Sequence, residues 1–124
     1  MDVRRSIGMW GEDCAVRYLE NLGWTVLERN WRYKKLGEVD IVAVEPSERN
    51  GVLVFCEVKA KRGRGYGDPL EAITRAKLAR LHRLACAWMS THEMAFDRVR
   101  IDAIGILAPK NEHWELTHVK AARL

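Results

Sequence analysis

The sequence predicts an α/β fold, with one domain over residues 1–124 and a central mixed five-stranded sheet flanked by helices in the order α-β-β-β-α-β-β. The length of 124 residues suits a single domain, since domains usually span roughly 100–200 residues. Hydrophobic residues make up 48% and charged residues 31%, as in folded globular proteins. Two segments have helical spacing of apolar residues and five have β-branched or aromatic runs, which together predict a sheet covered by helices.

The first half of the chain predicts one helix and three strands. Apolar residues recur every three or four positions from Ile7 to Leu22, which is the spacing of a helix, and Gly23 ends it. The loop of residues 45–51 contains the turn formers Pro46 and Gly51 and is typical of a hairpin connection. The three strands are expected at residues 24–27, 38–44 and 52–58.

The second half predicts a helix followed by two strands. Asp68 has the character of a helix N-cap, with Pro69 at the first helical position and Glu71 at the third. This helix is expected to run to about Met89. Strands are expected at residues 99–107 and 114–119, separated by a turn at 109–111.

Composition favours a cytoplasmic protein with no membrane partner. Apolar runs such as Val52 to Cys56 are far shorter than the ~20 residues of a membrane-spanning helix, and no apolar stretch follows the basic N-terminus. The three cysteines are expected to be buried thiols, because they are odd in number and widely spaced. The four histidines show no metal-ligand spacing. These cysteines and histidines are Cys14, Cys56, Cys86, His82, His92, His113 and His118.

Positive charge is concentrated in two segments. The net charge is +4 and the isoelectric point about 9.1, but residues 59–83 carry eight Lys or Arg against two acids, and residues 29–35 carry four against none. The rest of the chain is therefore net acidic. This distribution permits a nucleic-acid partner without requiring one.

Charged residues interrupt the apolar pattern of two strands. Side chains alternate between the faces of a strand, so Asp40 shares a face with Val42, and Glu57 shares one with Phe55. If Val44 pairs with Leu53 in an antiparallel hairpin, Val42 meets Phe55 and Asp40 meets Glu57. Two carboxylates would then face each other and repel.

The two predicted helices also carry charges on their packing faces. Lys77 falls within the apolar stripe of the second helix, and Glu12 leans toward the packed face of the first. With Asp40, Glu57 and Lys59, these residues could form one partly buried cluster, which a divalent cation would stabilise because buried charge is costly. A salt-bridge network, with Lys77 reaching solvent along its stem, would explain the same residues without a metal.

The residues around these charges resemble the YraN-like family of small bacterial endonuclease-like proteins within the PD-(D/E)XK nuclease superfamily. The superfamily motif corresponds to Asp40 followed by Glu57-Val58-Lys59, with Val39 in place of the proline. The resemblance implies a restriction-endonuclease-like core, similar to that of archaeal Holliday junction resolvases. It rests on Gly11, Glu12, Ala15, Lys77 and residues 30–32, 37–43, 54–59 and 66–73.

The resemblance implies a metal-dependent endonuclease that hydrolyses phosphodiester bonds in DNA, with branched or junction DNA as a candidate substrate. Mg²⁺, or Mn²⁺ in its place, would be held by Asp40, Glu57, the Val58 carbonyl and Glu12, directly or through water. Lys59 would orient the attacking water, and Lys77 would hold a carboxylate or the phosphate. The residues expected to contact nucleic acid are Arg32, Arg62, Arg64 and Tyr66.

Two other classes of function stay open on the sequence alone. The chain could be a nucleic-acid-binding module that keeps the fold without cutting, although two carboxylates facing a phosphate give a binder no advantage without a cation. It could instead be an interaction subunit of a larger assembly. An RNA substrate is also open, and a homodimer would follow if the substrate is a four-way junction.

Overall fold

The computed structural model describes residues 3–63, 67–108 and 113–122 and contains five strands, two α-helices and one short 3₁₀ turn within that part of the chain. The order of helices and strands matches the predicted pattern. The elements are α1 (Val3–Asn21), β1 (Thr25–Tyr33), β2 (Gly37–Glu45), β3 (Val52–Arg62), η2 (Pro69–Ala72), α2 (Arg75–Thr91), β4 (Arg98–Ala108) and β5 (Glu115–Val119).

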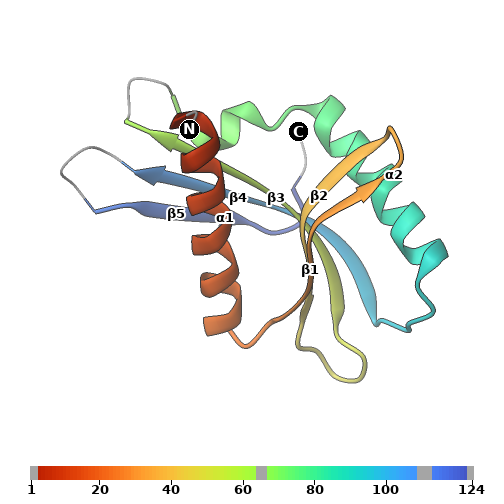
Figure 1. Cartoon of the computed structure of the whole chain (residues 1–124). Coiled ribbons are helices and arrows are strands. Elements are labelled where there is room, and N and C mark those ends of the chain that lie inside the picture. Colours follow the sequence, from red (N-terminus) through yellow and green to blue (C-terminus); the bar gives the residue numbers. More distant parts are fainter. Residues whose placement is uncertain (1–2, 64–66, 109–112, 123–124) are drawn as a thin grey trace.

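The strands form one mixed sheet in the spatial order β1-β2-β3-β4-β5. Among the described strands, only β3 and β4 pair in parallel, through the crossover that contains α2, and the other three pairs are antiparallel. The two long helices lie on opposite faces of this sheet (Figure 1). This arrangement confirms the predicted α/β class and the mixed five-stranded sheet.

Each face of the sheet has its own hydrophobic core. Leu19 of α1 packs with Ile41, Val54 and Ile104 on one face. Trp88 of α2 packs with Phe55 on the other face. The alternation of side chains along β3 feeds both cores, because successive residues point to opposite faces.

The β2–β3 hairpin has the predicted register. Val44 pairs with Leu53 and Val42 pairs with Phe55. The last paired residues toward the charged end are Ile41 and Cys56, so the predicted direct pairing of Asp40 with Glu57 falls one step beyond the ladder. The strands separate where the apolar residues give way to charged ones.

The predicted start of the second helix was wrong by about six residues. Asp68 does act as an N-cap, since its Oδ1 accepts a hydrogen bond from Leu70 N at 2.9 Å, but it caps only the 3₁₀ turn η2. Ile73 is extended and ends that turn. Thr74 then caps α2 by accepting a bond from Lys77 N at 3.2 Å. A second capping residue so close to the first allows a helix to restart in a new direction.

The surface differs from expectation at one cysteine. Cys14 and Cys56 are buried as predicted, but Cys86 is exposed on α2, because it lies on the side of the helix opposite Leu84 and Trp88.

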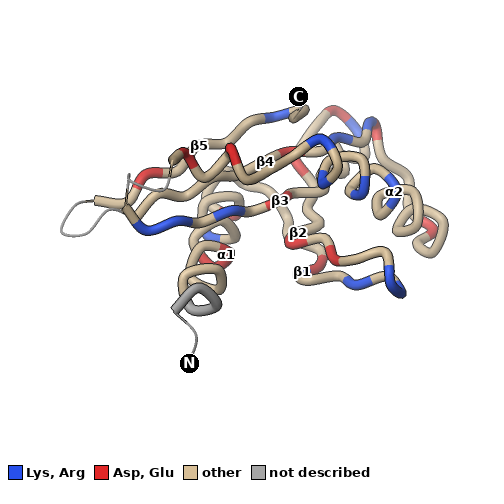
Figure 2. The backbone as a smooth tube through the Cα atoms, turned by 90° about the horizontal axis from the view of Figure 1, so that it is seen from above, with Lys and Arg blue, Asp and Glu red and all other residues tan. Residues whose placement is uncertain are grey.

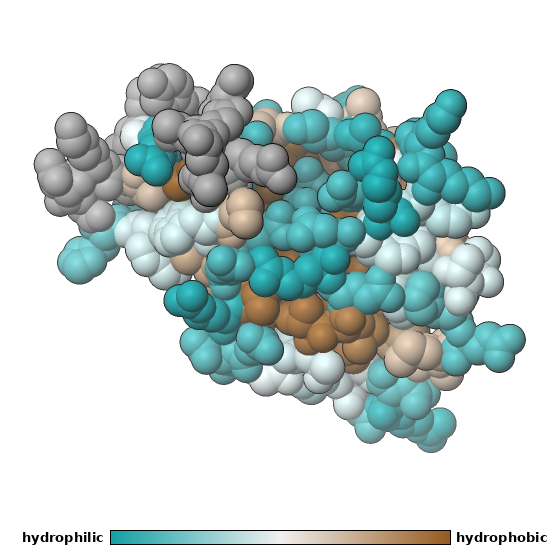
Figure 3. Space-filling view, viewed as in Figure 1, coloured by the Kyte–Doolittle hydropathy of each residue, from teal (hydrophilic) through white to brown (hydrophobic). Residues whose placement is uncertain are grey.

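The predicted turn at residues 109–111 lies outside the described residues. No helix within the described ranges is long and apolar enough to span a membrane. Figure 3 shows hydrophilic side chains around a band of hydrophobic surface on the face seen in Figure 1.

Candidate active site

Asp40 and Glu57 lie where β2 and β3 separate. The Asp40 carboxylate takes the place of a strand partner, because its Oδ2 accepts a hydrogen bond of 2.8 Å from the backbone N–H of Val58. Both carboxylate side chains are half-buried. The end of the ladder therefore brings two acidic groups near each other in a half-buried setting, without the direct pairing that the register predicted.

The electrostatic environment of this pair disfavours two negative charges. Burial raises the pKa of Asp40, against the lowering effect of the Val58 N–H. Burial and then the negative charge of Asp40 raise the pKa of Glu57 to about 7. Each carboxyl group therefore holds a proton more tightly than it would in water.

Two lysines face this acidic pair. Lys59 follows Glu57 at the second position along β3 and points to the same face of the sheet, and its charge lowers the pKa of both acids. Lys77 has the same effect on both. Its Nζ donates a hydrogen bond of 3.0 Å to the carbonyl oxygen of Ala72, at the end of η2. Lys77 is half-buried in the first turn of α2, one helical turn before Leu81, and therefore lies on the packed face of the helix as predicted. The buried residues of that face are Leu78, Leu81, Leu84, Ala85 and Trp88.

Glu12 approaches the same region from the other face of the sheet. Close packing places it there: a Cβ added to the preceding residue, Gly11, would lie 2.6 Å from the Cβ of Ala60 on β3. Burial raises the pKa of Glu12, and the charge of Asp40 raises it further. Its buried Oε1 has no hydrogen-bond partner, and the nearest guanidinium nitrogen of Arg29 is 3.8 Å away.

The acidic side chains of Glu12, Asp40 and Glu57 do not converge on one point in this structure. Within the described residues, no group of three or more His, Cys, Asp or Glu side chains is arranged to hold a metal ion. Mg²⁺ usually takes only one or two protein carboxylates and keeps several waters. The two carboxylates of Asp40 and Glu57 fit this coordination preference. The Oε1 atom of Glu12, which has no hydrogen-bond partner, suits a contact with the ion through a water molecule.

The residues expected to contact nucleic acid have different settings. Arg32 is exposed on β1, where its Nη1 lies 3.2 Å from Oε1 of Glu38. Arg62 is exposed at the end of β3. Arg64 and Tyr66 lie outside the described residues. Figure 2 shows Lys and Arg along the end of β3, along α2 and at the β1–β2 turn.

Arg80, which was not among the predicted site residues, also acts on the site. Its positive charge lowers the pKa of Glu57, and its effect is larger than that of Lys59. Arg80 lies three residues after Lys77 on α2, so the two share one side of the helix. That spacing was the signal in the sequence that could have identified it.

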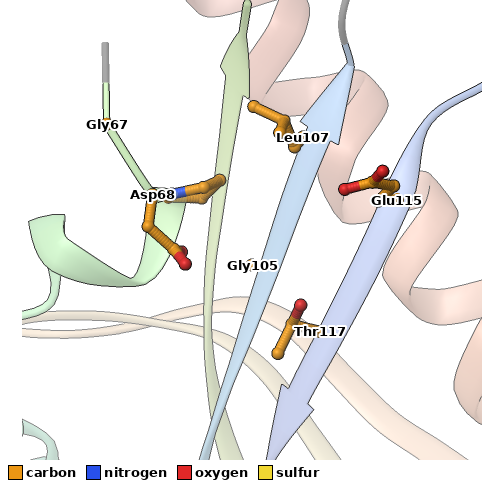
Figure 4. A pocket seen from close by; sticks show the side chains of 7 residues that line it. Gly67, Asp68, Gly105, Leu107, Glu115 and Thr117 are labelled. Atoms are coloured by element: carbon orange, nitrogen blue, oxygen red, sulfur yellow. The ribbon is translucent and has the colours of Figure 1, made fainter. Parts of the chain in front are cut away.

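A cavity of about 280 Å³ adjoins the site on the same face of the sheet. Gly105 of its floor pairs with Lys59. Figure 4 shows side chains of η2, β4 and β5 around this cavity. Its rim includes Asp68 and Glu115, so it is a poor place for a phosphate. The residues that line it are Gly67, Asp68, Pro69, Gly105, Leu107, Glu115 and Thr117.

A second charged cluster lies on the α1 face and was also missed. The fully buried Asp102 accepts hydrogen bonds from Arg100 at 2.7 and 3.0 Å and from the Ala121 N–H at 3.1 Å, and its Oδ2 lies 2.8 Å from Nε2 of His118. The other ring nitrogen of His118 lies 2.8 Å from the hydroxyl of Tyr18. Burial alone would raise the pKa of Asp102, but the bonds from His118 and Arg100 lower it below its usual value.

Comparison with known proteins gives consistent matches over nearly the whole chain. The sequence profile of the family described as "Uncharacterised protein family UPF0102" matches residues 11–106. A UPF0102 protein of Streptomyces coelicolor is 48% identical over 112 residues, which cover 89% of this chain and 82% of that protein. One from Acidothermus cellulolyticus is 41% identical over 130 residues, covering 96% and 94%. One from Rhodococcus opacus is 40% identical over 117 residues, covering 94% and 95%. The chain therefore belongs to the UPF0102 family.

Proposed function

We propose that the protein is a metal-dependent endonuclease that hydrolyses phosphodiester bonds in DNA. One observation carries the proposal: Asp40 and Glu57 lie half-buried where β2 and β3 separate, and both have raised pKa values. The positive charges of two lysines act on both carboxylates. Buried like charges are unfavourable unless something compensates them. This combination is typical of a functional site and less so of a structural ion pair.

Asp40 and Glu57 are the proposed metal ligands, and the carbonyl of Val58 is the third. In an extended strand the N–H and carbonyl of one residue point to the same side, and the N–H of Val58 points toward Asp40. When bound, Mg²⁺ or Mn²⁺ would supply charge stabilisation for the phosphate and a more acidic water. The Val58–Asp40 hydrogen bond fixes the orientation of one carboxylate before any metal arrives.

The lysines supply the positive charge that the reaction requires. Lys59 is placed to orient the attacking water or to stabilise negative charge that develops on the phosphate. Lys77 is restrained by its bond to the Ala72 carbonyl, so it would act from a fixed position behind the pair. Glu12, with its partnerless Oε1, would accept a hydrogen bond from a water in the site.

The basic residues outside the site are the proposed contacts with flanking phosphates. Arg62 is exposed at the end of β3, three residues beyond Lys59, and Arg32 is exposed on β1. Arg64 and Tyr66 follow Arg62 in the sequence and belong to the same proposal. Such contacts position a nucleic acid without reading its sequence. The proposal extends to branched DNA as the substrate and to a homodimer as the active form of the enzyme.

The proposal is tested by cleavage of labelled DNAs, namely a single strand, a duplex, a flap and a four-way junction, with Mg²⁺, with Mn²⁺ and with chelator. Wild type is compared with Glu57→Gln and Lys59→Ala. Glu20→Gln is the matched control, because Glu20 is an exposed carboxylate on α1. We expect cleavage that requires metal, is lost in both site variants and is unchanged in the control.

Two outcomes would contradict the proposal. Cleavage that persists in Glu57→Gln would assign the activity to another site or to a contaminant. DNA binding without cleavage, equal in wild type and Glu57→Gln, would favour a non-cleaving nucleic-acid-binding module.

A further inference from the structure

Arg80 lies at the rim of the acidic pair and is anchored over the start of β2. A Cβ added to Gly37 would lie 3.4 Å from Cδ and 3.8 Å from Nε of Arg80, so the arginine stem crosses this glycine. Gly37 has a φ of +131°, which suits glycine and few other residues. It comes three residues before Asp40 on the same strand. The bare backbone at Gly37 therefore gives the Arg80 stem a defined path toward the site.

The charge of Arg80 also acts on Glu57. Among positive groups that lower the pKa of Glu57, Arg80 ranks after Lys77 and before Lys59. Lys59 belongs to the sequence motif, whereas Arg80 comes from a separate helix. The site is therefore bordered by three cations from two elements.

The guanidinium of Arg80 is not committed to a carboxylate. Over the described ranges, Arg80 makes no ion pair within 4.0 Å, and it is exposed to solvent. Other arginines near acids are engaged: Arg29 bonds Asp13 at 2.7 Å, and Arg100 bonds Asp102 and Glu45. An arginine that served only to neutralise Glu57 would be expected to close an ion pair with it.

We propose that Arg80 binds a phosphate of the nucleic-acid backbone next to the one that is cleaved. The substrate class in this inference rests on the proposed function. A guanidinium presents a planar fork of donors that matches two oxygens of one phosphate. Lys59 and Lys77 lie half-buried in the site, whereas Arg80 is exposed at its rim, where a neighbouring phosphate would pass. Arg80 thereby fixes which phosphate enters the site.

The test distinguishes two roles of Arg80, namely binding a phosphate and neutralising the charge of Glu57. The Glu57 charge is removed first, so that only phosphate binding can respond to a change at Arg80. In a Glu57→Gln background, the affinity for a labelled duplex and a labelled four-way junction is measured between about 50 and 200 mM salt. The variants are Arg80→Ala, Arg80→Lys and the control Arg98→Ala. Arg98 is exposed and pairs with Val52, the first residue of β3, whereas Glu57 lies near the middle of that strand. Melting midpoints check that each variant is folded, and Arg80→Gln replaces Arg80→Ala if the latter melts early.

We expect Arg80→Ala to weaken binding about tenfold at low salt and to reduce the slope of log affinity against log salt by about one. Arg80→Lys should keep the slope and lose only part of the affinity, because it keeps the charge without the fork. Arg98→Ala should bind like its parent. If Arg80→Ala also matches its parent, Arg80 acts only on Glu57, and the inference is wrong.

Wild-type cleavage, measured in parallel, distinguishes this inference from the proposed function. Cleavage by wild type together with no effect of Arg80→Ala on binding would overturn the inference alone. An effect of Arg80→Ala on binding without any cleavage by wild type would overturn the nuclease and keep the phosphate contact. No DNA binding by any protein in the series would overturn both.

Discussion

At the scale of single residues, Glu57 is the group whose charge the fold disfavours most clearly. Burial and the neighbouring Asp40 raise its pKa from 4.5 to about 7. A raised pKa means that the folded state prefers the protonated acid, so this group favours folding fully below pH 4.5 and progressively loses that contribution as pH rises through 7. The ionised Glu57 carboxylate therefore destabilises the folded state at neutral pH when no cation is bound.

Glu57→Gln should therefore stabilise the metal-free protein, and more at high pH than at low pH. Glutamine keeps the shape but carries no charge. We expect its free energy of unfolding to exceed that of wild type by about 1–3 kcal/mol at pH 8.5 and by little at pH 5. Urea unfolding in chelator at both pH values measures this. Glu20→Gln should show no such dependence, and an equal gain at both pH values would contradict the assigned pKa.

Asp102 is the opposite case, a buried carboxylate that the fold stabilises in its charged form. Asp102→Asn removes the anionic partner of His118 and leaves Arg100 with Glu45 alone, so we expect the free energy of unfolding to fall by about 3–5 kcal/mol at pH 7. Because its pKa is lowered from 3.8, the wild-type protein should lose this contribution only as pH falls below about 4. Urea unfolding at pH 7 and pH 3.5 measures both effects.

The exposed pair of Asp13 and Arg29 provides the control for Asp102. Asp13→Asn removes a partner from a 2.7 Å ion pair at the surface and should cost less than about 1 kcal/mol. A loss for Asp102→Asn no larger than this would show that the buried network contributes little to stability.

The same sequence criterion that selected Asp40 and Glu57 applies equally to Asp102. An aspartate stands in the apolar run Ile101-Asp102-Ala103-Ile104, and His118 follows Leu116 on one face of the last strand. Metal-ligand spacing among the histidines does not reveal a histidine that serves as a hydrogen-bond partner of a buried carboxylate. The contacts of Tyr18 with His118 join residues 100 positions apart, which local patterns cannot predict.

At the scale of elements, two glycines of α1 have opposite roles. A Cβ at Gly11 would lie 2.6 Å from the Cβ of Ala60, whereas a Cβ at Gly8 would meet nothing within 4 Å. Gly11→Ala should therefore lower the free energy of unfolding by about 1–3 kcal/mol through overpacking. Gly8→Ala should raise it by about 0.5–1 kcal/mol, because alanine favours a helix. Thermal unfolding compares the pair, and a gain in both variants would show that α1 can shift away from β3.

The elements themselves were largely predictable, and their boundaries were less so. The strands of the hairpin followed from residue types and fixed the register from Val44 to Val42. The start of α2 did not follow from the residue types, because Asp68-Pro69 is a sound helix-start signal that here begins only a 3₁₀ turn. Whether a capped turn continues as an α-helix depends on packing. Here Leu70 and Pro69 contact Gly105 on β4, where a Cβ would lie 2.9 Å from Leu70.

At the scale of the whole molecule, the two faces of the sheet have different roles. The α2 face carries the acidic pair with Lys59, Lys77 and Arg80, and the α1 face carries the buried network of Asp102. Glu12 connects them at the point where β2 and β3 separate. The fold class follows from periodicity and order, but the meeting of these groups depends on strand order and on the crossover, which residue patterns do not specify.

A divalent cation should therefore stabilise the whole fold, in a way that depends on pH. Mg²⁺ at ten times its dissociation constant adds about 1.4 kcal/mol to the free energy of unfolding when it binds only the folded state. At pH 8 the Glu57 carboxylate is ionised and can bind the ion, whereas at pH 5.5 a proton competes for it. We expect Mg²⁺ to raise the melting midpoint of wild type at pH 8, to have a smaller effect at pH 5.5, and to have almost none on Glu57→Gln. Differential scanning fluorimetry with Mg²⁺ and with K⁺ at matched ionic strength measures this. An equal shift in Glu57→Gln would show that the ion acts elsewhere, because only binding between Asp40 and Glu57 ties the stabilisation to that carboxylate.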